Sequence, residues 1–356
     1  MINGFAHRKM VMLIYFLIEG DDNTIKRYMQ SPYGSQCAGS VISLFYRKVI
    51  SKATKEKVIK GLWWQTIKKL SREIAKSLPR EFGIQLPGKV KMLVRCIYRY
   101  LDANGHAPEG LYVFADLERL SDESLTKAEA VRTILAESGS AVRILNSPAH
   151  TMRRYDVLRT LYENGINDFQ TYRWSDGEWP LKYPVFLRYE NVHAVLSPII
   201  GSREILDYTL NQLEMNGGLS ERLLITEFCD TADRNGIYRK YSAFVVGDRV
   251  FPWNLSFSKN WMVKASKMKD GELLAEEEKY VNGNPHADIL REICSITRIE
   301  YGRIDYSMLG NDIRVWEINT NPHITYEGEE RVGPRKPVFD LVEQRMLSAL
   351  KGLTEY

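Results

Sequence analysis

The chain has 356 residues, of which 44% are hydrophobic and 26% are charged, and its formal net charge is +4. At about 100–200 residues per domain this length predicts two or three domains, and the near-average composition excludes a wholly disordered or collagen-like chain. The longest apolar run, residues 10–18, is shorter than the roughly 18–20 residues of a membrane span and indicates a buried strand or helix. The four cysteines lack metal-type spacing, which is typical of reduced thiols in a cytoplasmic protein.

The net charge is distributed unevenly along the chain. Residues 1–105 contain 19 Lys and Arg against 7 Asp and Glu, a balance of +12, whereas the remainder has 30 and 38, a balance of −8. Apolar residues at four-residue intervals predict amphipathic helices over 55–78 and 89–101. We therefore expect a basic, mainly helical N-terminal region, which either packs on the rest of the chain or offers a surface to an anionic membrane. It contains no specific nucleic-acid motif.

The pattern changes after residue 105 to alternating strands and helices. Strand patterns occur at 111–115, 141–145, 183–188 and 223–227, and hairpin patterns at 241–251 and 304–319. Helical patterns begin at 124, 155, 202, 285 and 337. The first two strand–helix pairs predict a small α/β unit with parallel strands. We predict domains at 1–105, 106–175 and 176–356, the last divided between residues 232 and 233.

The second hairpin carries the strongest chemical signal in the sequence. The two-residue period places Arg303 and Asp305 on one face of its first strand, and Val315, Glu317 and Asn319 on one face of its second. The turn position sets Asp305 opposite Glu317. Carboxylates that face each other across a hairpin repel, so we expect a cation between them or a proton on one. Two carboxylates and an amide oxygen suit Mg²⁺, and the flanking apolar residues favour a buried strand pair over a solvated face.

These residues resemble the closing motif of the ATP-grasp superfamily of carboxylate–amine ligases, an Arg-x-Asp strand followed by a Glu-x-Asn-Thr-x-Pro strand. The residues that match in order are Arg303, Asp305, Glu317, Asn319, Thr320 and Pro322. The resemblance covers about residues 112–356 and leaves out the basic N-terminal region. It implies the α/β (α+β) class and an ATP-grasp fold, with 106–175 as the pre-ATP-grasp unit and 176–356 as the ATP-grasp domain.

The resemblance also implies roles for individual residues. Asp305, Glu317 and Asn319 would hold Mg²⁺, two ions in all, with Mn²⁺ as an alternative metal. Arg303 and Lys264 would be catalytic, since the equivalent cations stabilise the transferring phosphoryl group. Contacts with ATP would come from Arg188, Glu227, Phe228, Cys229, Asp230 and Lys240.

The predicted phosphate loop departs from the superfamily pattern. Arg188 stands where a lysine is usual, and it keeps the charge while adding a bidentate fork. The stretch 190–201 contains one glycine, Gly201, although several would be needed for backbone N–H groups to cradle phosphates. Either side chains such as His193 contact the phosphates instead, or the loop has a different shape.

The resemblance implies an ADP-forming ligase that uses ATP and Mg²⁺ to join a carboxylate and an amine through an acyl phosphate. Its substrates would be small molecules or peptides, and a homodimer is an open alternative to a monomer. A second hypothesis is a small-molecule kinase on the same scaffold. A third is a non-catalytic nucleotide-binding adaptor whose basic front binds lipid or a partner. We expect a cytoplasmic location, with peripheral contact to anionic membranes through residues 1–105 as the alternative.

Overall fold

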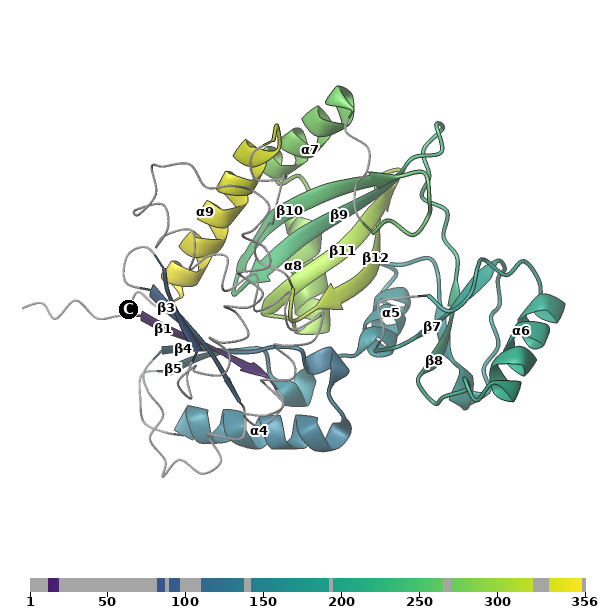
Figure 1. The fold of residues 1–356 in the computed structure, drawn as a ribbon, viewed down its shortest axis with the longest axis horizontal. Coiled ribbons are helices and arrows are strands. Elements are labelled where there is room, and N and C mark those ends of the chain that lie inside the picture. Colours follow the sequence, from purple (N-terminus) through teal and green to yellow (C-terminus); the bar gives the residue numbers. More distant parts are fainter. Residues whose placement is uncertain are drawn as a thin grey trace, which may run out of the picture. The chain divides into compact units, whose positions relative to one another are not determined.

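The computed structural model describes residues 12–18, 82–86, 90–96, 110–137, 142–191, 195–264, 270–322 and 333–353. Its mixture of helices and strands confirms the predicted α/β class (Figure 1). The chain forms two compact units. The first contains the described residues up to 116, those from 120 to 149, and those from 322 onward; the second contains 117–119 and the described residues from 150 to 321. In these stretches no helix has the length and apolar character needed to cross a bilayer. The predicted domain boundaries stay a prediction.

The first unit is built on a five-stranded sheet with the order β2-β3-β1-β4-β5. Its strands are β1 (Met12–Ile18), β2 (Phe82–Leu86), β3 (Val90–Cys96), β4 (Gly110–Phe114) and β5 (Val142–Leu145). All neighbouring pairs are parallel except β2 with β3. Its helices are α4 (Asp122–Glu137) and α9 (Lys336–Gly352). Helix α4 connects the parallel strands β4 and β5, which agrees with the strand–helix–strand part of the predicted α/β unit, whereas the helix predicted after the second strand belongs to the second unit.

The described part of the basic N-terminal region consists of strands. Val90–Cys96 is a strand, although the apolar spacing predicted a helix over 89–101. It lies between β2 and β1, and its short apolar run at 92–94 cannot be told from a buried helix segment by spacing alone. The apolar run at 10–18 forms β1, one of the two alternatives predicted for it. The helix predicted for 55–78 lies outside the described residues.

The second unit contains a small three-stranded antiparallel sheet with the order β6-β8-β7. Its strands are β6 (Thr171–Arg173), β7 (Val185–Tyr189) and β8 (Leu223–Glu227). Helix α6 (Arg203–Met215) contributes Leu206 and Leu210 to the same apolar core (Figure 1). This small sheet positions Arg188 on β7 and Glu227 at the end of β8.

The second unit also contains a four-stranded antiparallel sheet with the order β10-β9-β11-β12 (Figure 1). Its strands are β9 (Tyr238–Val246), β10 (Arg249–Ser258), β11 (Tyr301–Leu309) and β12 (Asp312–Asn319). Besides α6, the described residues of this unit form three helices that pack against this sheet: α5 (Arg154–Glu163) on β12, α7 (Gly271–Gly283) on β10, and α8 (Ala287–Thr297) on β10 and α5. The hairpin β11–β12 is the one predicted to carry the chemistry.

The register of this hairpin confirms that Asp305 lies opposite Glu317. A bulge follows, because Tyr306 pairs with Val315 and leaves Trp316 as an extra residue on β12. Cross-strand partners share a face, so Val315 lies on the face of Tyr306, where both are fully buried. The predicted common face of Val315 and Glu317 is therefore wrong. The bulge resets the alternation between them, which aims Glu317 at the site while Val315 faces the core.

Asn167 completes the backbone bonding of β12 beside this bulge. Its buried side chain donates to the Val315 carbonyl at 3.1 Å and accepts from the Val315 N–H at 2.8 Å. β12 is an edge strand, so these two groups have no ladder partner on that side. Asn167→Ala is expected to lower the free energy of unfolding by about 2 kcal/mol in urea titrations. The control Asn211→Ala, at an exposed position of α6, should change it by less than about 0.5 kcal/mol; equal losses would contradict this role.

Candidate functional site

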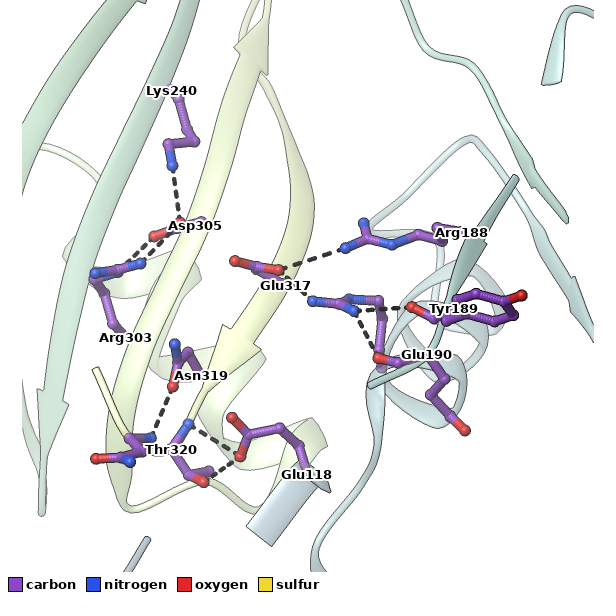
Figure 2. Close-up of polar contacts among 12 residues, drawn as sticks. Glu118, Arg188, Tyr189, Glu190, Lys240, Arg303, Asp305, Glu317, Asn319 and Thr320 are labelled. Carbon is purple, nitrogen blue, oxygen red and sulfur yellow. Dashed lines mark hydrogen bonds and ion pairs between the residues drawn. The ribbon is translucent and has the colours of Figure 1, made fainter. Parts of the chain in front are cut away.

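Asp305 is held by four hydrogen bonds in the middle of the four-stranded sheet, and Figure 2 shows those from Lys240 and Arg303. Its carboxylate accepts from Arg303 Nε at 2.8 Å and Nη2 at 3.2 Å, and from Lys240 Nζ at 3.1 Å. Ser242, its register partner on β9, donates from Oγ at 2.8 Å. The structure thus brings together three of the predicted site residues and adds Ser242, which the sequence reasoning missed.

The carboxyl group of Asp305 is buried, with 2% of the residue exposed. Burial acts to raise its pKa, but the charges of Arg303 and Lys240 act against it, and the net pKa lies below its usual range. The group is therefore ionised at neutral pH. A buried carboxylate of this kind is stable only while its cations stay close to it.

Glu317 receives two guanidinium groups from outside the four-stranded sheet (Figure 2). Its Oε2 atom lies 2.5 Å from Arg154 Nη2 and 3.8 Å from Arg188 Nη2. Arg154 is the first residue of α5, and its Nη1 also donates to the Glu190 carbonyl at 2.6 Å, just beyond β7. This contact ties α5, β7 and β12 together at one carboxylate.

Arg188 shares this environment with a like charge. Burial, and after it the neighbouring charge of Arg154, lower the pKa of its guanidinium to about 9, while the charge of Glu317 acts in the opposite direction. Arg188 remains protonated at neutral pH. Two adjacent buried guanidinium groups are favourable next to anions, so the charges here suit a ligand with several negative oxygens.

Asn319 lies at the end of β12, opposite Arg303 in the register. Its Oδ1 accepts the Asn321 N–H at 2.8 Å, which sets the amide orientation and leaves capacity for a further contact. Gly302 is required beside it, because a Cβ there would lie 2.9 Å from the Asn319 carbonyl oxygen. Within the described stretches no three His, Cys, Asp or Glu side chains gather as a metal site; the predicted set has two carboxylates and one amide.

Glu227 is fully engaged inside the small sheet. Its carboxylate accepts from the Gln170 N–H at 2.9 Å, the Tyr172 hydroxyl at 2.9 Å and the Lys182 N–H at 3.1 Å. Only 3% of the residue is exposed. In this arrangement the side chain joins the segments around β6 and β8, and its contact with ATP stays a prediction.

The three residues after Glu227 also have internal partners. The Phe228 N–H donates to the Pro184 carbonyl at 2.8 Å, so this backbone donor is already used. The Cys229 thiol is hydrogen-bonded to Asp168, and burial, followed by the charge of Asp168, raises its pKa to about 11. Asp230 Oδ1 accepts a backbone N–H two residues further on, at 3.0 Å. The roles of these residues in nucleotide binding stay predictions.

The raised pKa of Cys229 predicts slow alkylation at neutral pH. The thiolate is the reactive form, so the rate at Cys229 should rise about tenfold per pH unit from neutral pH up to about pH 10. The measurement is iodoacetamide labelling followed by peptide mass spectrometry, with Cys294, whose pKa burial raises to about 12, as the internal comparison. Fast, pH-independent labelling of Cys229 would contradict the assignment.

The remaining predicted site residues are not joined to this cluster by any contact among the described residues. Lys264 is exposed and directly precedes 265–269, which the structure does not describe. His193 and the loop 323–332 also lie outside the described residues. Their predicted roles are therefore untested.

Arg154 is the main site residue that the sequence reasoning missed. A signal was available, because Arg153 and Arg154 begin an amphipathic helix, where the helix dipole disfavours cations. Cations at that position need an anion nearby. The structure supplies one in Glu317, which lies 163 residues away in sequence.

Comparisons with known proteins find similarity in structure alone. Neither a protein-family model nor a curated protein matches the sequence. D-alanine–D-alanine ligase from Bacillus anthracis is 10% identical with a TM-score of 0.46, covering 96% of this chain and 99% of that one. A RimK domain ATP-grasp protein from Sphaerobacter thermophilus is 10% identical with a TM-score of 0.41, covering 94% and 99%. The ATP-grasp ligase PsnB is 11% identical with a TM-score of 0.45, covering 97% and 100%.

Two of these proteins are named as ATP-grasp proteins, the superfamily that the hairpin motif resembles. With identities of 10–11% and TM-scores below 0.5, the similarity assigns no activity to this chain. The functional proposal therefore rests on the geometry around Asp305 and Glu317.

Proposed function

We propose that the chain is an ATP-dependent ligase that forms an amide bond between a carboxylate and an amine, with release of ADP and phosphate. The observation that supports this most directly is the pair of opposed carboxylates, Asp305 and Glu317, each flanked by two cationic side chains. The same cluster therefore offers carboxylates that can bind a metal ion and cationic side chains that can bind phosphate oxygens. Phosphoryl transfer depends on this combination, because its catalysis is mainly positioning and charge stabilisation.

The donor set fits Mg²⁺. Asp305, Glu317 and Asn319 offer hard oxygen ligands, and Mg²⁺ commonly uses one or two carboxylates together with water and phosphate oxygens. Bound there, Mg²⁺ would supply charge neutralisation to the transferring phosphoryl group. The number of ions and the alternative of Mn²⁺ stay predictions.

The cationic side chains would perform the rest of the phosphate recognition. Arg188, Lys240 and Arg154 provide fixed donors for phosphate oxygens in place of a glycine-rich loop. Arg303 would stabilise charge on the phosphoryl group as it passes to the substrate carboxylate. The exposed Lys264 would have to move toward this group to take part.

The proposed reaction has two steps. A carboxylate oxygen of the first substrate attacks the γ-phosphorus of ATP, and ADP leaves with the bonding electron pair. The nitrogen of the amine then attacks the acyl carbon and loses a proton, and phosphate leaves with the second electron pair. The substrates are small molecules or peptides. Membrane contact through residues 1–105, a homodimer and a cytoplasmic location stay predictions.

One observation favours the competing proposal of a non-catalytic adaptor. Asp305 and Glu317 are already paired with cations of the chain itself, so the cluster is also a self-consistent structural network. In that case the chain would bind nucleotide without turning it over. The two proposals therefore differ in whether bound ATP is converted to ADP and phosphate.

A phosphate-release screen tests the proposal. The full chain is incubated with ATP, Mg²⁺ and pooled amino acids, amino sugars and short peptides, and phosphate and ADP are measured. We expect ADP and phosphate in equal amounts, with a new amide detected by mass spectrometry. A stable phosphorylated product without free phosphate would instead establish the kinase, and ATP binding in calorimetry without release of ADP or phosphate would favour the adaptor.

A further inference from the structure

A glutamate from a distant part of the chain lies beside the end of β12. Glu118 belongs to η2 (Leu117–Arg119), which is assigned to the second unit although its neighbours in sequence are not. Both Thr320 Oγ1 and the Thr320 N–H donate to Glu118 Oε2, the latter at 3.4 Å. The Leu117 N–H in turn donates to Thr320 Oγ1 at 3.0 Å. These bonds hold the Glu118 carboxylate in a defined place.

Only one of the two carboxylate oxygens of Glu118 is used. Oε2 accepts both bonds from Thr320, whereas Oε1 is buried and has no hydrogen-bond partner. A buried carboxylate oxygen without a donor loses its hydration and gains nothing in return, so each such atom calls for an explanation, and a donor from a bound ligand is one. No hydrogen bond from the described residues to Oε1 offsets the free energy lost when this oxygen is removed from water.

The position of Glu118 relates this oxygen to the proposed active site. Thr320 directly follows Asn319, and Asn319 is opposite Arg303 in the hairpin register. Figure 2 shows Glu118 next to Thr320 at the same end of β12 as Asn319. A ligand on Oε1 would therefore lie at the end of the strand that carries the proposed metal ligands.

The chemistry of Oε1 selects a positively charged donor group. A carboxylate accepts hydrogen bonds and binds cations, and its bonds to charged donors are about twice as strong as neutral ones. A metal ion is the weaker alternative, because no group of three His, Cys, Asp or Glu side chains that includes Glu118 occurs in the described part of the chain. An ammonium group needs one good acceptor and is the ordinary form of an aliphatic amine at neutral pH.

We propose that Glu118 Oε1 binds the amino group of the amine substrate, which arrives as an ammonium ion, and so positions it beside the acyl phosphate. The ammonium nitrogen has no lone pair, so it first gives one proton to the Glu118 carboxylate, and the neutral amine then attacks the acyl carbon. The proposal rests on the proposed ligase function and names a substrate class, primary amines that are cations in solution. Glu118 is a substrate-binding residue here. It has no role in binding ATP or metal.

The test is the variant Glu118→Gln, with Glu123→Gln as the matched control on the exposed surface of α4. Binding of a panel of amino-acid amides and diamines is measured by calorimetry in the presence of Mg²⁺ and a non-hydrolysable ATP analogue. Loss of the charged acceptor should weaken binding of the cationic amines by about 10- to 100-fold. Their N-acetylated, neutral counterparts should bind weakly to wild type and variant alike.

Binding of the ATP analogue and its Mg²⁺ dependence are measured on the same samples. We expect both to be unchanged in Glu118→Gln, which also shows that the variant is folded. Unchanged amine binding in the variant, or no binding of any panel member to the wild type, would overturn the proposal. A changed Mg²⁺ dependence would overturn it in favour of a metal ligand. Failure of the wild type to bind the ATP analogue would instead count against the ligase function itself.

Discussion

Glu317→Gln is expected to lower ATP-dependent phosphate release by about 100-fold or more, the largest effect predicted for this chain. Glutamine preserves the size of the side chain and an oxygen that can accept from Arg154, so the structural contact at 2.5 Å has a replacement. The negative charge is lost, and with it the proposed hard anionic ligand for Mg²⁺ and the counter-charge of Arg154 and Arg188. The measurement is steady-state phosphate release over a Mg²⁺ titration.

The control for this variant is Glu163→Gln on α5, which removes a carboxylate from an exposed ion pair with Arg159. Exposed pairs of this type contribute little, so activity and the melting temperature should stay close to wild type. Glu317→Gln should retain cooperative unfolding, which separates loss of function from loss of fold. Full activity in Glu317→Gln would refute the metal assignment and favour a purely structural role for the opposed carboxylates.

The hairpin shows why this part of the site could be predicted from sequence. Both strands alternate and the turn at Gly310 is short, so counting outward from it places Asp305 and Glu317 within one residue of facing positions. Gly310 adopts φ +65°, a left-handed conformation that glycine supplies at little cost in a tight turn. Local pattern and turn chemistry therefore determine the hairpin and its register to within one residue.

The bulge at Trp316 shows where such counting fails. The turn is centred half a residue earlier than the count assumed, and the extra residue on β12 restores the pairing of Asp305 with Glu317. The prediction for the carboxylates was confirmed while the prediction for Val315 was wrong, because a bulge changes the face of everything on one side of it. Its support comes from Asn167, about 150 residues away, which no local pattern reveals.

The contacts of Glu227 show a second limit. A buried carboxylate at the end of a strand resembles a ligand-binding residue in sequence, but its role depends on which donors the fold brings to it. Here Gln170, Tyr172 and Lys182 supply three. They come from loops and short strands whose arrangement is set by tertiary packing, so a structural bond and a nucleotide contact have the same sequence signature.

The local charge around Asp305 and Glu317 is opposite in sign to the net charge of residues 106–356. Residues 106–356 carry a balance of −8, which by itself would repel ATP. Around the opposed carboxylates, however, the four cations Arg154, Arg188, Lys240 and Arg303 reverse the local balance. Electrostatic interactions fall off within about 8–10 Å in physiological salt, so this local set outweighs the overall charge for a ligand bound in the cluster.

Arg154→Ala is expected to weaken ATP binding by about 10- to 100-fold, which corresponds to the loss of one charged donor to phosphate. Arg154 is restrained on two sides, by Glu317 at 2.5 Å and by the Glu190 carbonyl at 2.6 Å, so it presents its guanidinium without needing to be ordered by the ligand. Arg154→Lys should recover part of the affinity, since it keeps the charge and loses the fork. Calorimetry with ATP and Mg²⁺ measures both variants.

Arg159→Ala provides the control on the same helix, because Arg159 lies one turn further along α5 and makes exposed contacts with Glu163 and Glu178. It should bind ATP as the wild type does. A purely structural role for Arg154 makes a different prediction: the alanine variant would melt earlier and the protein that remains folded would bind ATP normally. Equal ATP affinity in Arg154→Ala and Arg159→Ala would therefore assign Arg154 to the fold, and the phosphate contacts would rest on Arg188 and Lys240.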